Sequence, residues 1–587
     1  MGQIQLLFLD ELPINESKTS YSDGKNLVIQ LNEIELNDAL HTKAIGTIFR
    51  YKKNRWFSTG TKILTYVEGK KASAFNQNDF ILVASRFANI TNKNNPGEFN
   101  AVNFWKSKGV FKTCFLTDVD ICLLQKNNEN WIDKQLINVR NHLGNLLEKE
   151  LSGKNLAIAK ALILGDKSYL DQETRNSFGA TGAMHVLAVS GMHIGIISQL
   201  LLFIFQFFSQ FIQRKSAVFS IVLLLWIYAL LTGFSPSVVR AVFMFSVLML
   251  AQEMGENFSA INTLFFTAFI LALINPMVLY DIGFQLSYLA MLGIFTLYKP
   301  IAAWYSTKNK LLNYFWQGSA VGFAAQAMTV PLTLYYFHQF PNYFALTNLG
   351  IMAISTIAMG FGMGIFILHY IPIIGKIASV ILAFSLWSML AFLQWVEELP
   401  GSVEYGFSIP LYLVPILMVL TFMLIVNKCV TLKWKMAALL FIGTLIFISF
   451  KRYEQHNVSH LCFFNTNQLV FTVKIKSQIV VIYDWKNEKK DQQVKGIISN
   501  YAKLYPGRLT FIPLKKENLN VKFGRHLIKV KKTTDGRHIL MDNKVYVVKY
   551  KNDESISTDK RSKETVIYMP WMANRQSLTN GAMLFKI

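Results

Sequence analysis

Ten apolar blocks between residues 183 and 450 constrain the fold of this chain more than any other feature of its sequence. A helix of about 17–25 mainly apolar residues is long enough to cross the hydrocarbon core of a bilayer, which is about 30 Å thick. With 52% hydrophobic residues and a mean hydropathy of +0.30, the chain is more apolar than a typical soluble protein. We therefore expect a polytopic α-helical membrane protein with segments at 183–208, 216–233, 237–253, 259–274, 281–298, 316–336, 343–370, 374–396, 409–427 and 433–450.

The basic residues of the loops between these segments predict the orientation in the membrane. Lys and Arg are in excess in cytoplasmic loops. One set of alternate loops carries nine of them, and the other set carries none. Both flanking domains are therefore expected outside the cytoplasm, and because no signal peptide precedes the first of them, we expect further membrane helices upstream. The nine are Arg214, Lys215, Lys299, Lys308, Lys310, Lys376, Lys428, Lys433 and Lys435.

Two β-rich domains and a helical linker flank the apolar region at 183–450. Residues 1–130 alternate β-branched and aromatic residues with polar ones between turn sequences, which predicts a small β-barrel or sandwich. Residues 131–182 place apolar residues at helical spacing and predict an amphipathic helical linker. Residues 451–587 again read as short strands, with one helix near 491–503.

Positive charge is concentrated in the last of these domains. The whole chain has a net charge of +23, and residues 451–587 carry 26 Lys/Arg against 11 Asp/Glu, a difference of +15. A solvated basic surface, or one attracted to anionic lipid head groups, explains this excess as well as a polyanionic partner does.

The four cysteines include no CxxC pair, which argues against a thiolate zinc site. Cys114 and Cys122 flank a strand-like segment. They can pair across a hairpin if that domain meets an oxidising compartment, and otherwise remain free thiols.

The first membrane segment, which contains HVLAVSGMHIGI, has polar residues that a plain lipid anchor does not need. On a helical wheel His185, Ser190 and His193 share one sector, while Gly191 and Gly195 lie on the other side and allow close helix packing. A hydrogen bond to a neighbouring helix explains either histidine alone, but three polar groups together favour a hydrated interior. An intramembrane hydrolase with Ser190 as nucleophile is an alternative, although no third, orienting group is evident.

Arg240 lies inside the third segment, where a charged side chain costs about 2.5–3.5 kcal/mol on insertion scales. It should therefore face a cavity or a partner. Other polar side chains enter the apolar segments from the same predicted outer side, where His338 also lies, so we expect an outward-opening polar vestibule with Arg240 near its throat. The predicted channel-lining residues are His185, Ser190, Gly191, His193, Arg240, Asp281, Gln285, Ser287 and Gln326.

A basic and aromatic run, FRYKKNRWF at 49–57, is the clearest nucleic-acid signal of the N-terminal domain. Cations neutralise phosphates, and aromatic faces stack on bases at about 1–3 kcal/mol per base. An ordinary amphipathic hairpin is the alternative. The predicted DNA-binding residues are Arg50, Tyr51, Lys52, Lys53, Arg55 and Trp56.

Three ordered motifs resemble those of the ComEC family of bacterial competence proteins: AMHVLAVSGMHIG, GFSPSVVRAVFM and NPMVLYDIGFQLSYLAMLGI. The family's His, Ser-Gly and His residues match His185, Ser190, Gly191 and His193. Its Pro-Ser and Arg-Ala pairs match Pro236, Ser237, Arg240 and Ala241, its Gly-Phe-Gln-Leu-Ser run matches 283–287, and LTNL at 346–349 matches its Asn-Leu. The segment NNPGEFNAVNFWKSKGV is similar to the end of the family's OB-like extracytoplasmic domain. The resemblance covers most of 1–450.

This resemblance implies a channel that carries single-stranded DNA across the bacterial inner membrane during natural transformation. It also implies a cytoplasmic, ATP-driven, helicase-like motor, because the chain has no Gly-x4-Gly-Lys-Ser/Thr phosphate loop of its own, and an extracytoplasmic DNA-delivery protein. No cofactor is expected. A small-molecule or lipid transporter of the inner membrane is the main alternative, although it needs neither the basic tail nor the run at 49–57.

The C-terminal domain departs from the pattern of many members of this family, which end in a metallo-β-lactamase-like domain. That chemistry needs a His-x-His-x-Asp-His metal cluster. Residues 451–587 contain only His456, His460, His526 and His538, and no such cluster. We expect a degenerate relative of that domain, without metal ligands and without nuclease activity.

Overall fold

The structure, a computed structural model, divides into two compact units. The first comprises Met1–Ile90, Ala101–Val330 and Pro341–Val403, and the second Thr91–Asn100, Pro331–Phe340 and Glu404–Ile587. The described residues are 27–586 apart from 38–40, 53–54, 70–74, 76–78, 84–86, 126–130, 188, 208–213, 254–258, 427–431, 467, 485–487, 515–517, 524–525, 534–535, 542–543, 550–563 and 569–582.

A mixed sheet of seven strands forms the N-terminal part of the first unit. The strands lie in the order β5-β6-β3-β2-β1-β4-β7, antiparallel except that β6 runs parallel to β3. Alternate apolar residues such as Ile29, Ile48 and Ile63 fill its core. The prediction of a β-rich domain is confirmed, whereas its OB-like form remains a prediction. The strands are β1 Leu27–Asn37, β2 His41–Lys52, β3 Arg55–Glu68, β4 Phe80–Val83, β5 Ala88–Asn89, β6 Val110–Thr117 and β7 Ile121–Gln125, with helix α2 Ala101–Ser107 between β5 and β6.

The two cysteines of this sheet do not pair across a hairpin. Cys114 lies on β6 and is buried, while Cys122 lies on β7 and is exposed, and both are free. Of the two alternatives, the structure supports free thiols, because β6 and β7 follow one another in the chain yet are not neighbours in the sheet.

Three helices make up the linker: α3 Trp131–Glu150, α4 Gly153–Leu164 and α5 Gln172–Ala180. The prediction of an amphipathic helix is wrong for α4, in which every residue from Ala157 to Leu164 is buried. Helices α3, α6, α13 and α14 contact α4, and its residues after Leu156 have no exposed side. Even Lys160 is buried, held by Glu148 at 2.6 Å and by the ring of Tyr169.

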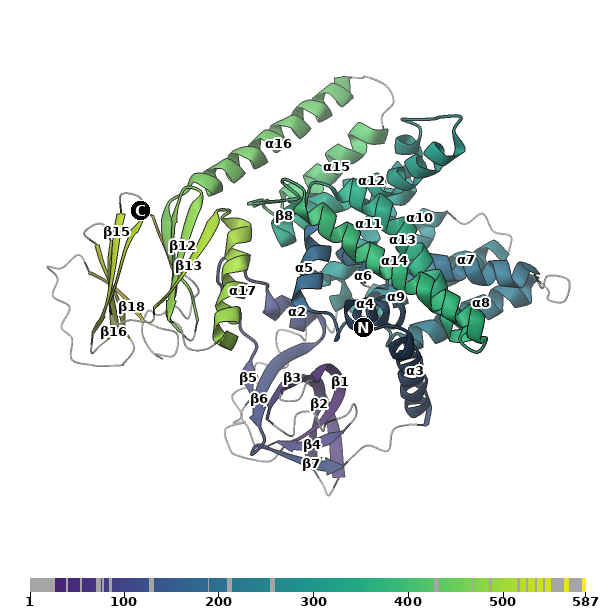
Figure 1. Cartoon of the computed structure of the whole chain (residues 1–587), viewed down its shortest axis with the longest axis horizontal. Coiled ribbons are helices and arrows are strands. Elements are labelled where there is room, and N and C mark those ends of the chain that lie inside the picture. The colour runs from purple at the N-terminus through teal and green to yellow at the C-terminus, as the bar shows by residue number, and fades with distance from the viewer. Residues whose placement is uncertain are drawn as a thin grey trace. The chain divides into compact units, whose positions relative to one another are not determined.

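Each of the ten predicted membrane segments contains a helix in the described part of the chain (Figure 1). Four of these helices, α9, α13, α14 and α16, are long and apolar enough to cross a membrane, while α7, α8, α10 and α15 are apolar but shorter. The ten are α7 Gly191–Phe207, α8 Arg214–Leu231, α9 Pro236–Glu253, α10 Ala260–Ile274, α11 Ile282–Ala302, α12 Lys310–Phe337, α13 Phe344–Leu368, α14 Pro372–Glu398, α15 Leu413–Val426 and α16 Leu432–Asn457.

Large apolar side chains on several of these helices point outward. Phe203, Phe265, Phe384 and Leu439 are each more than half exposed. Exposed apolar surface of this extent marks an interaction surface. On helices of this composition the fitting environment is lipid, which supports a membrane protein.

The first predicted segment is not one continuous helix. A short helix, α6 Met184–Leu187, ends before Ala188, and α7 begins only at Gly191. The shared helical-wheel sector of His185, Ser190 and His193 assumed a continuous helix, so that prediction is wrong. The two histidines lie on different helices, with Ser190 in the connection between them.

Close approach between helices occurs at particular glycines. A Cβ atom on Gly293 of α11 would lie 2.3 Å from the carbonyl oxygen of Ala324 on α12. Gly191 and Gly195 of α7 face Ala241 and Phe245 of α9, at 3.8 and 3.4 Å from an added Cβ. Gly191 and Gly195 therefore lie on the side of α7 that packs against α9, at ordinary contact distances rather than in the close approach predicted for them.

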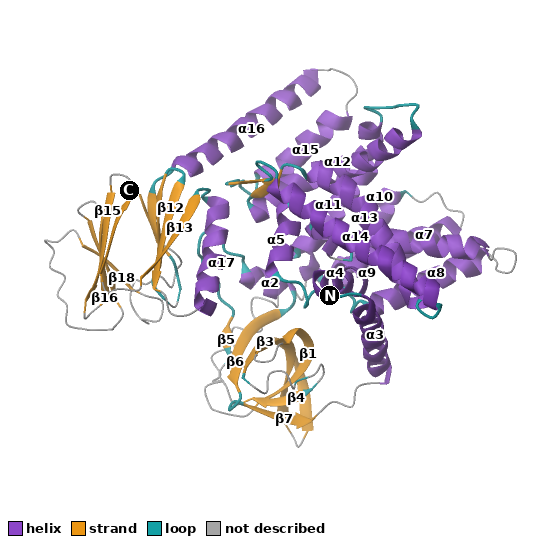
Figure 2. Cartoon of the chain, viewed as in Figure 1, coloured by secondary structure: helices purple, strands orange, loops and turns teal. Residues whose placement is uncertain are grey.

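The second unit contains a C-terminal sandwich of two sheets with a helix on one outer side (Figure 2). One sheet has the order β13-β12-β11-β10-β19 and the other β14-β15-β16-β17-β18. Helix α17, Glu488–Leu504, covers the first sheet and confirms the predicted helix near 491–503. The strands are β10 His460–Phe463, β11 Val470–Ile475, β12 Gln478–Asp484, β13 Arg508–Leu514, β14 Asn518–Phe523, β15 His526–Thr533, β16 Gly536–Met541, β17 Lys544–Lys549, β18 Glu564–Tyr568 and β19 Met583–Lys586.

A buried lysine joins the sandwich to the end of α16. The Nζ atom of Lys474 donates to the carbonyl oxygens of His456, Lys476 and Pro506. His456 is the penultimate residue of α16, and Pro506 follows α17 by two residues. An ammonium group at two helix C-terminal ends satisfies carbonyls that have no partner within the helix.

Candidate functional site

Three segments that are far apart in the sequence meet in the first unit. The break between α6 and α7, the first turns of α9 and the start of α11 are connected through Ser237 and Arg240. We call this group, Val189, Ser190, His193, Ser237, Arg240 and Gly283, the motif junction. All three recognised motifs contribute to it.

The helix break is fixed by a bond from α9. The hydroxyl of Ser237 donates to the carbonyl oxygen of Val189 at 2.8 Å. A carbonyl freed by the end of a helix needs such a partner when it lies away from water. Ser237 thus holds the non-helical turn against α9. Ser237 was not among the predicted channel-lining residues, although it belongs to the second motif.

His193 has a structural role at the start of α7. The backbone N–H of Ser190 donates to its Nδ1 atom at 3.0 Å, and the Ser190 hydroxyl lies 3.3 Å from the same nitrogen. This is one half of a capping box, in which the third helical residue usually is Glu or Gln. Because Nδ1 accepts, the ring proton belongs on Nε2, which is buried and has no hydrogen-bond partner among the described residues. None of the described residues therefore supplies the third group that the hydrolase alternative needs to orient His193.

Arg240 lies on α9 with only 6% of its surface exposed. One Nη atom donates to the carbonyl oxygen of Gly283, at the start of α11, over 3.1 Å. Its Nε and other Nη atoms have no hydrogen-bond partner in the described part of the chain. A guanidinium group presents five N–H donors and keeps its charge. Arg240 therefore keeps several charged donors without a hydrogen-bond partner among the described residues.

Asp281 is primarily the N-cap of α11. Its Oδ1 atom accepts from the backbone N–H of Phe284 at 2.7 Å. Gln285, one turn further, donates to the carbonyl of Leu279 at 2.8 Å. Both bonds stabilise the first turn of α11, where the carbonyl oxygen of Gly283 accepts from Arg240.

The other predicted lining residues do not belong to the motif junction. His185 bonds through Nδ1 to the carbonyl of Gly182 at 3.2 Å. Ser287 and Gln326 are half-buried on α11 and α12, and among the described residues no hydrogen bond joins either to the junction. His338 belongs to the second unit, where its Nδ1 atom lies 2.8 Å from the carbonyl oxygen of Phe407.

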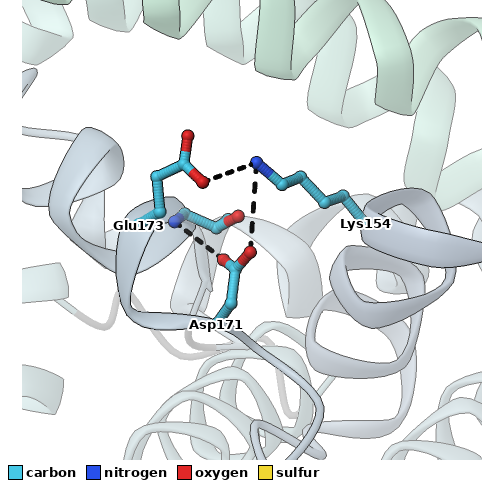
Figure 3. Close-up of polar contacts among 4 residues, drawn as sticks. Lys154, Asp171 and Glu173 are labelled. Atoms are coloured by element: carbon cyan, nitrogen blue, oxygen red, sulfur yellow. Dashed lines mark hydrogen bonds and ion pairs between the residues drawn. The ribbon is translucent and has the colours of Figure 1, made fainter. Parts of the chain in front are cut away.

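The linker positions the chain that leads into α6 (Figure 3). Lys154 of α4 pairs with Glu173 at 3.0 Å and lies 3.9 Å from Asp171. Asp171 caps α5 by accepting from the backbone N–H of Thr174 at 2.8 Å. An exposed ion pair of this kind contributes little stability by itself, but with the cap it fixes where α5 begins.

The predicted DNA-binding run forms the end of a hairpin. Strands β2 and β3 pair there, with Tyr51 opposite Trp56 and Lys52 opposite Arg55. Lys53 lies outside the described residues. The backbone thus confirms a hairpin, and DNA binding by these residues stays a prediction.

Asn348 was also missing from the predicted site. It lies on α13, and its side-chain amide is 3.7 Å from the position of a Cβ atom on Gly322 of α12. The available signal was its place in LTNL, the segment that resembles a family element.

Comparison with known proteins identifies one matching family model, described as "Competence protein", over residues 162–455, half of the chain. All three motifs of the junction lie inside this range. The solved structures contain no significant match.

Relatives with similar sequences come from three bacteria. ComE operon protein 3 of Bacillus subtilis is 28% identical over 42% of this chain and 30% of its own length. An uncharacterized protein of Aquifex aeolicus is 27% identical over 38% of this chain and 53% of its own. Recombination protein 2 of Haemophilus influenzae is 31% identical over 24% of this chain and 19% of its own. The chain thus matches less than two thirds of the length of each relative.

Proposed function

Because this chain belongs to the ComEC family of competence proteins, we propose that it is a channel carrying single-stranded DNA across the bacterial inner membrane during natural transformation. A role in DNA uptake follows from the family, whose model is described as "Competence protein". To this role the proposal adds that the DNA is single-stranded, that the membrane is the inner one and that the chain forms a multi-pass channel.

The observation that carries the proposal is the motif junction around Arg240. A buried guanidinium group with unused donors is expensive in an apolar region unless an anion or water can reach it. Successive phosphates of a DNA strand are such anions. The broken helix beside it is also typical, because irregular backbone at membrane depth is tolerated where it lines a cavity.

The remaining predicted lining residues fit the same proposal to different degrees. His193 contributes the buried Nε2 atom, Ser190 lies in the connection before α7, and Gly191 is the first residue of α7. Asp281 shapes the start of α11 and its carboxylate also interacts electrostatically with Arg240. Gln285 acts indirectly, by shaping the same helix start. His185, Ser287 and Gln326 are proposed as lining residues on sequence grounds alone.

The flanking domains are proposed to lie outside the cytoplasm and to receive the DNA. The hairpin end at 49–57 combines cations with aromatic side chains, as single-strand binding requires. The charge difference of +15 in 451–587 has the sign that a polyanion needs. We propose further that the C-terminal domain does not cleave DNA, and metal-dependent cleavage by the purified chain would contradict this.

The energy for transport is proposed to come from a partner. Moving one phosphate charge into a negative interior costs about 2.3 kcal/mol per 100 mV of membrane potential. A channel without a nucleotide-binding loop needs a cytoplasmic ATP-driven motor that pulls the strand, and an outer protein that delivers it.

Replacement of Arg240 tests the proposal directly. Cells expressing Arg240→Leu, Arg240→Lys or the parent chain at equal levels are given labelled DNA, and arrival at the surface and entry into the cytoplasm are measured separately. We expect Arg240→Leu to lower entry at least tenfold, which corresponds to about 1.4 kcal/mol, with surface arrival unchanged, and Arg240→Lys to retain part of the entry. Normal entry with Arg240→Leu would show that the junction does not act on DNA.

A further inference from the structure

The outer side of the second sheet of the C-terminal sandwich is an exposed basic surface. Its inner side packs against the first sheet through Ile528, Val530 and Ile539, all fully buried. Because side chains alternate along a strand, the residues between these point away from the sandwich. We call this outer side of β14, β15 and β16 the basic face.

The register of the three strands determines the composition of the basic face. Lys529 lies opposite Asn520 on one side and Leu540 on the other, and Lys531 lies between Asn518 and His538. Lys522 is paired with Leu527 and is diagonal to Lys529. The side chains of the basic face that the structure describes are therefore three lysines, two asparagines, a histidine and two leucines. They include no carboxylate.

The lysines of the face are exposed and evenly spaced. Lys522, Lys529 and Lys531 are all exposed, and none forms an ion pair among the described residues. Residues two apart on one strand are separated by about 6.7 Å, and diagonal neighbours by about 7–8 Å. The three ammonium groups thus form a row of cations that crosses from β14 to β15.

We propose that the basic face binds the phosphate backbone of single-stranded DNA without sequence preference. This inference rests on the proposed function for the choice of ligand, and on charge complementarity for the surface itself. Lys and Asn side chains are both common donors to phosphate oxygens. A flexible single strand can follow a twisted sheet, whereas duplex DNA is stiff over about 150 base pairs.

An anionic membrane surface fits the face less well. Sequence segments that bind acidic lipids usually combine about four to eight Lys/Arg residues, and only three are present here. Described side chains of the face also include no Trp, Tyr or Phe to enter the lipid interface. The two asparagines, in contrast, can donate hydrogen bonds to the phosphate oxygens of a nucleic acid.

The test compares two triple variants of the full chain in detergent. The face variant carries Lys522→Gln, Lys529→Gln and Lys531→Gln. The control variant carries Lys476→Gln, Lys495→Gln and Arg508→Gln, which removes the same charge from exposed positions elsewhere in the second unit. Binding of a labelled single-stranded oligonucleotide is measured over a series of KCl concentrations.

Each phosphate contact to a single strand contributes about 0.7 to the slope of log affinity against log salt concentration. We expect the face variant to lose about 2 from this slope and the control variant to keep it. Lys529→Gln alone should lose about 0.7. An unchanged slope in the face variant, or an equal loss in both triple variants, would overturn the inference.

Vesicles of anionic lipid provide the second arm. If the face variant lost vesicle binding but kept the salt dependence of DNA binding, the face would be a lipid surface and the inference would be wrong. The result for Arg240→Leu is independent of both arms, so failure of the basic face is distinguishable from failure of the channel proposal.

Discussion

At the scale of single residues, different atoms of one buried polar side chain have different roles. Some form hydrogen bonds that hold the fold, and others have no partner among the described residues. Nδ1 of His193 accepts the N–H of Ser190 and caps α7, whereas its Nε2 atom has no partner among the described residues. Arg240 similarly uses one nitrogen for Gly283 and leaves two. One side chain can therefore hold the fold with one atom while another atom has no partner among the described residues.

His460 of the C-terminal sandwich supports a prediction about pH. It is buried on β10, and its Nε2 atom lies 2.7 Å from the hydroxyl of Tyr501. Burial, with a contribution from the nearby Lys474 ammonium group, lowers the pKa of His460 from 6.5 to about 4. Between these values the unfolded chain binds the proton and the folded chain does not. The free energy of unfolding should therefore fall as the pH drops from 6.5 to 4, by at most about 1.4 kcal/mol per pH unit.

Pulse proteolysis of the solubilised chain at a series of pH values, with the C-terminal fragment as readout, checks this prediction. His460→Gln keeps a hydrogen-bond partner for Tyr501 but cannot titrate. Its stability should be lower than that of the parent at pH 7 and should change less between pH 6.5 and 4. An equal pH dependence in both chains would assign the effect to other groups.

At the scale of elements, glycine contacts determine how closely two helices approach. Gly293→Ala should push α11 away from α12, because the added Cβ would lie 2.3 Å from a backbone carbonyl oxygen that cannot turn aside. Overpacking of this kind costs about 1–3 kcal/mol. Since α11 also supplies the Gly283 carbonyl to Arg240, we expect lower thermal stability in detergent together with lower DNA entry.

The matched control is Gly360→Ala on α13, where an added Cβ meets nothing within 4 Å. Alanine is a better helix former than glycine by about 1 kcal/mol. This variant should be as stable as the parent or more so, with normal DNA entry. A similar loss in both variants would mean that glycine itself, and not the contact with α12, matters.

At the scale of the whole molecule, the distribution of basic residues predicts the orientation of the chain. Lys308 lies between α11 and α12 on the predicted cytoplasmic side, and Lys495 lies on α17 in the C-terminal domain. In a chain without its native cysteines, Lys495→Cys should react with a membrane-impermeant thiol reagent in intact spheroplasts. Lys308→Cys should react only after the cells are permeabilised. The opposite pattern would place both flanking domains in the cytoplasm.

Local chemistry explains what the sequence by itself determined. Long apolar blocks specify helices wherever they occur, so all ten predicted segments contain one. Strand alternation likewise predicted the β-rich ends of the chain, and the three motifs identified the family. None of these inferences required knowing which residues become neighbours.

The tertiary structure decided every feature that depends on neighbours. The break before α7 is held by Ser237 from another helix, and the residues of α4 after Leu156 are buried because four other helices contact α4. Cys114 and Cys122 are close in sequence but lie on strands that do not pair. The meeting of Arg240 with Gly283, and the row of lysines on the basic face, arise from packing and strand register. Such contacts between distant segments depend on the free energy of the whole fold, which no local pattern of residues reports.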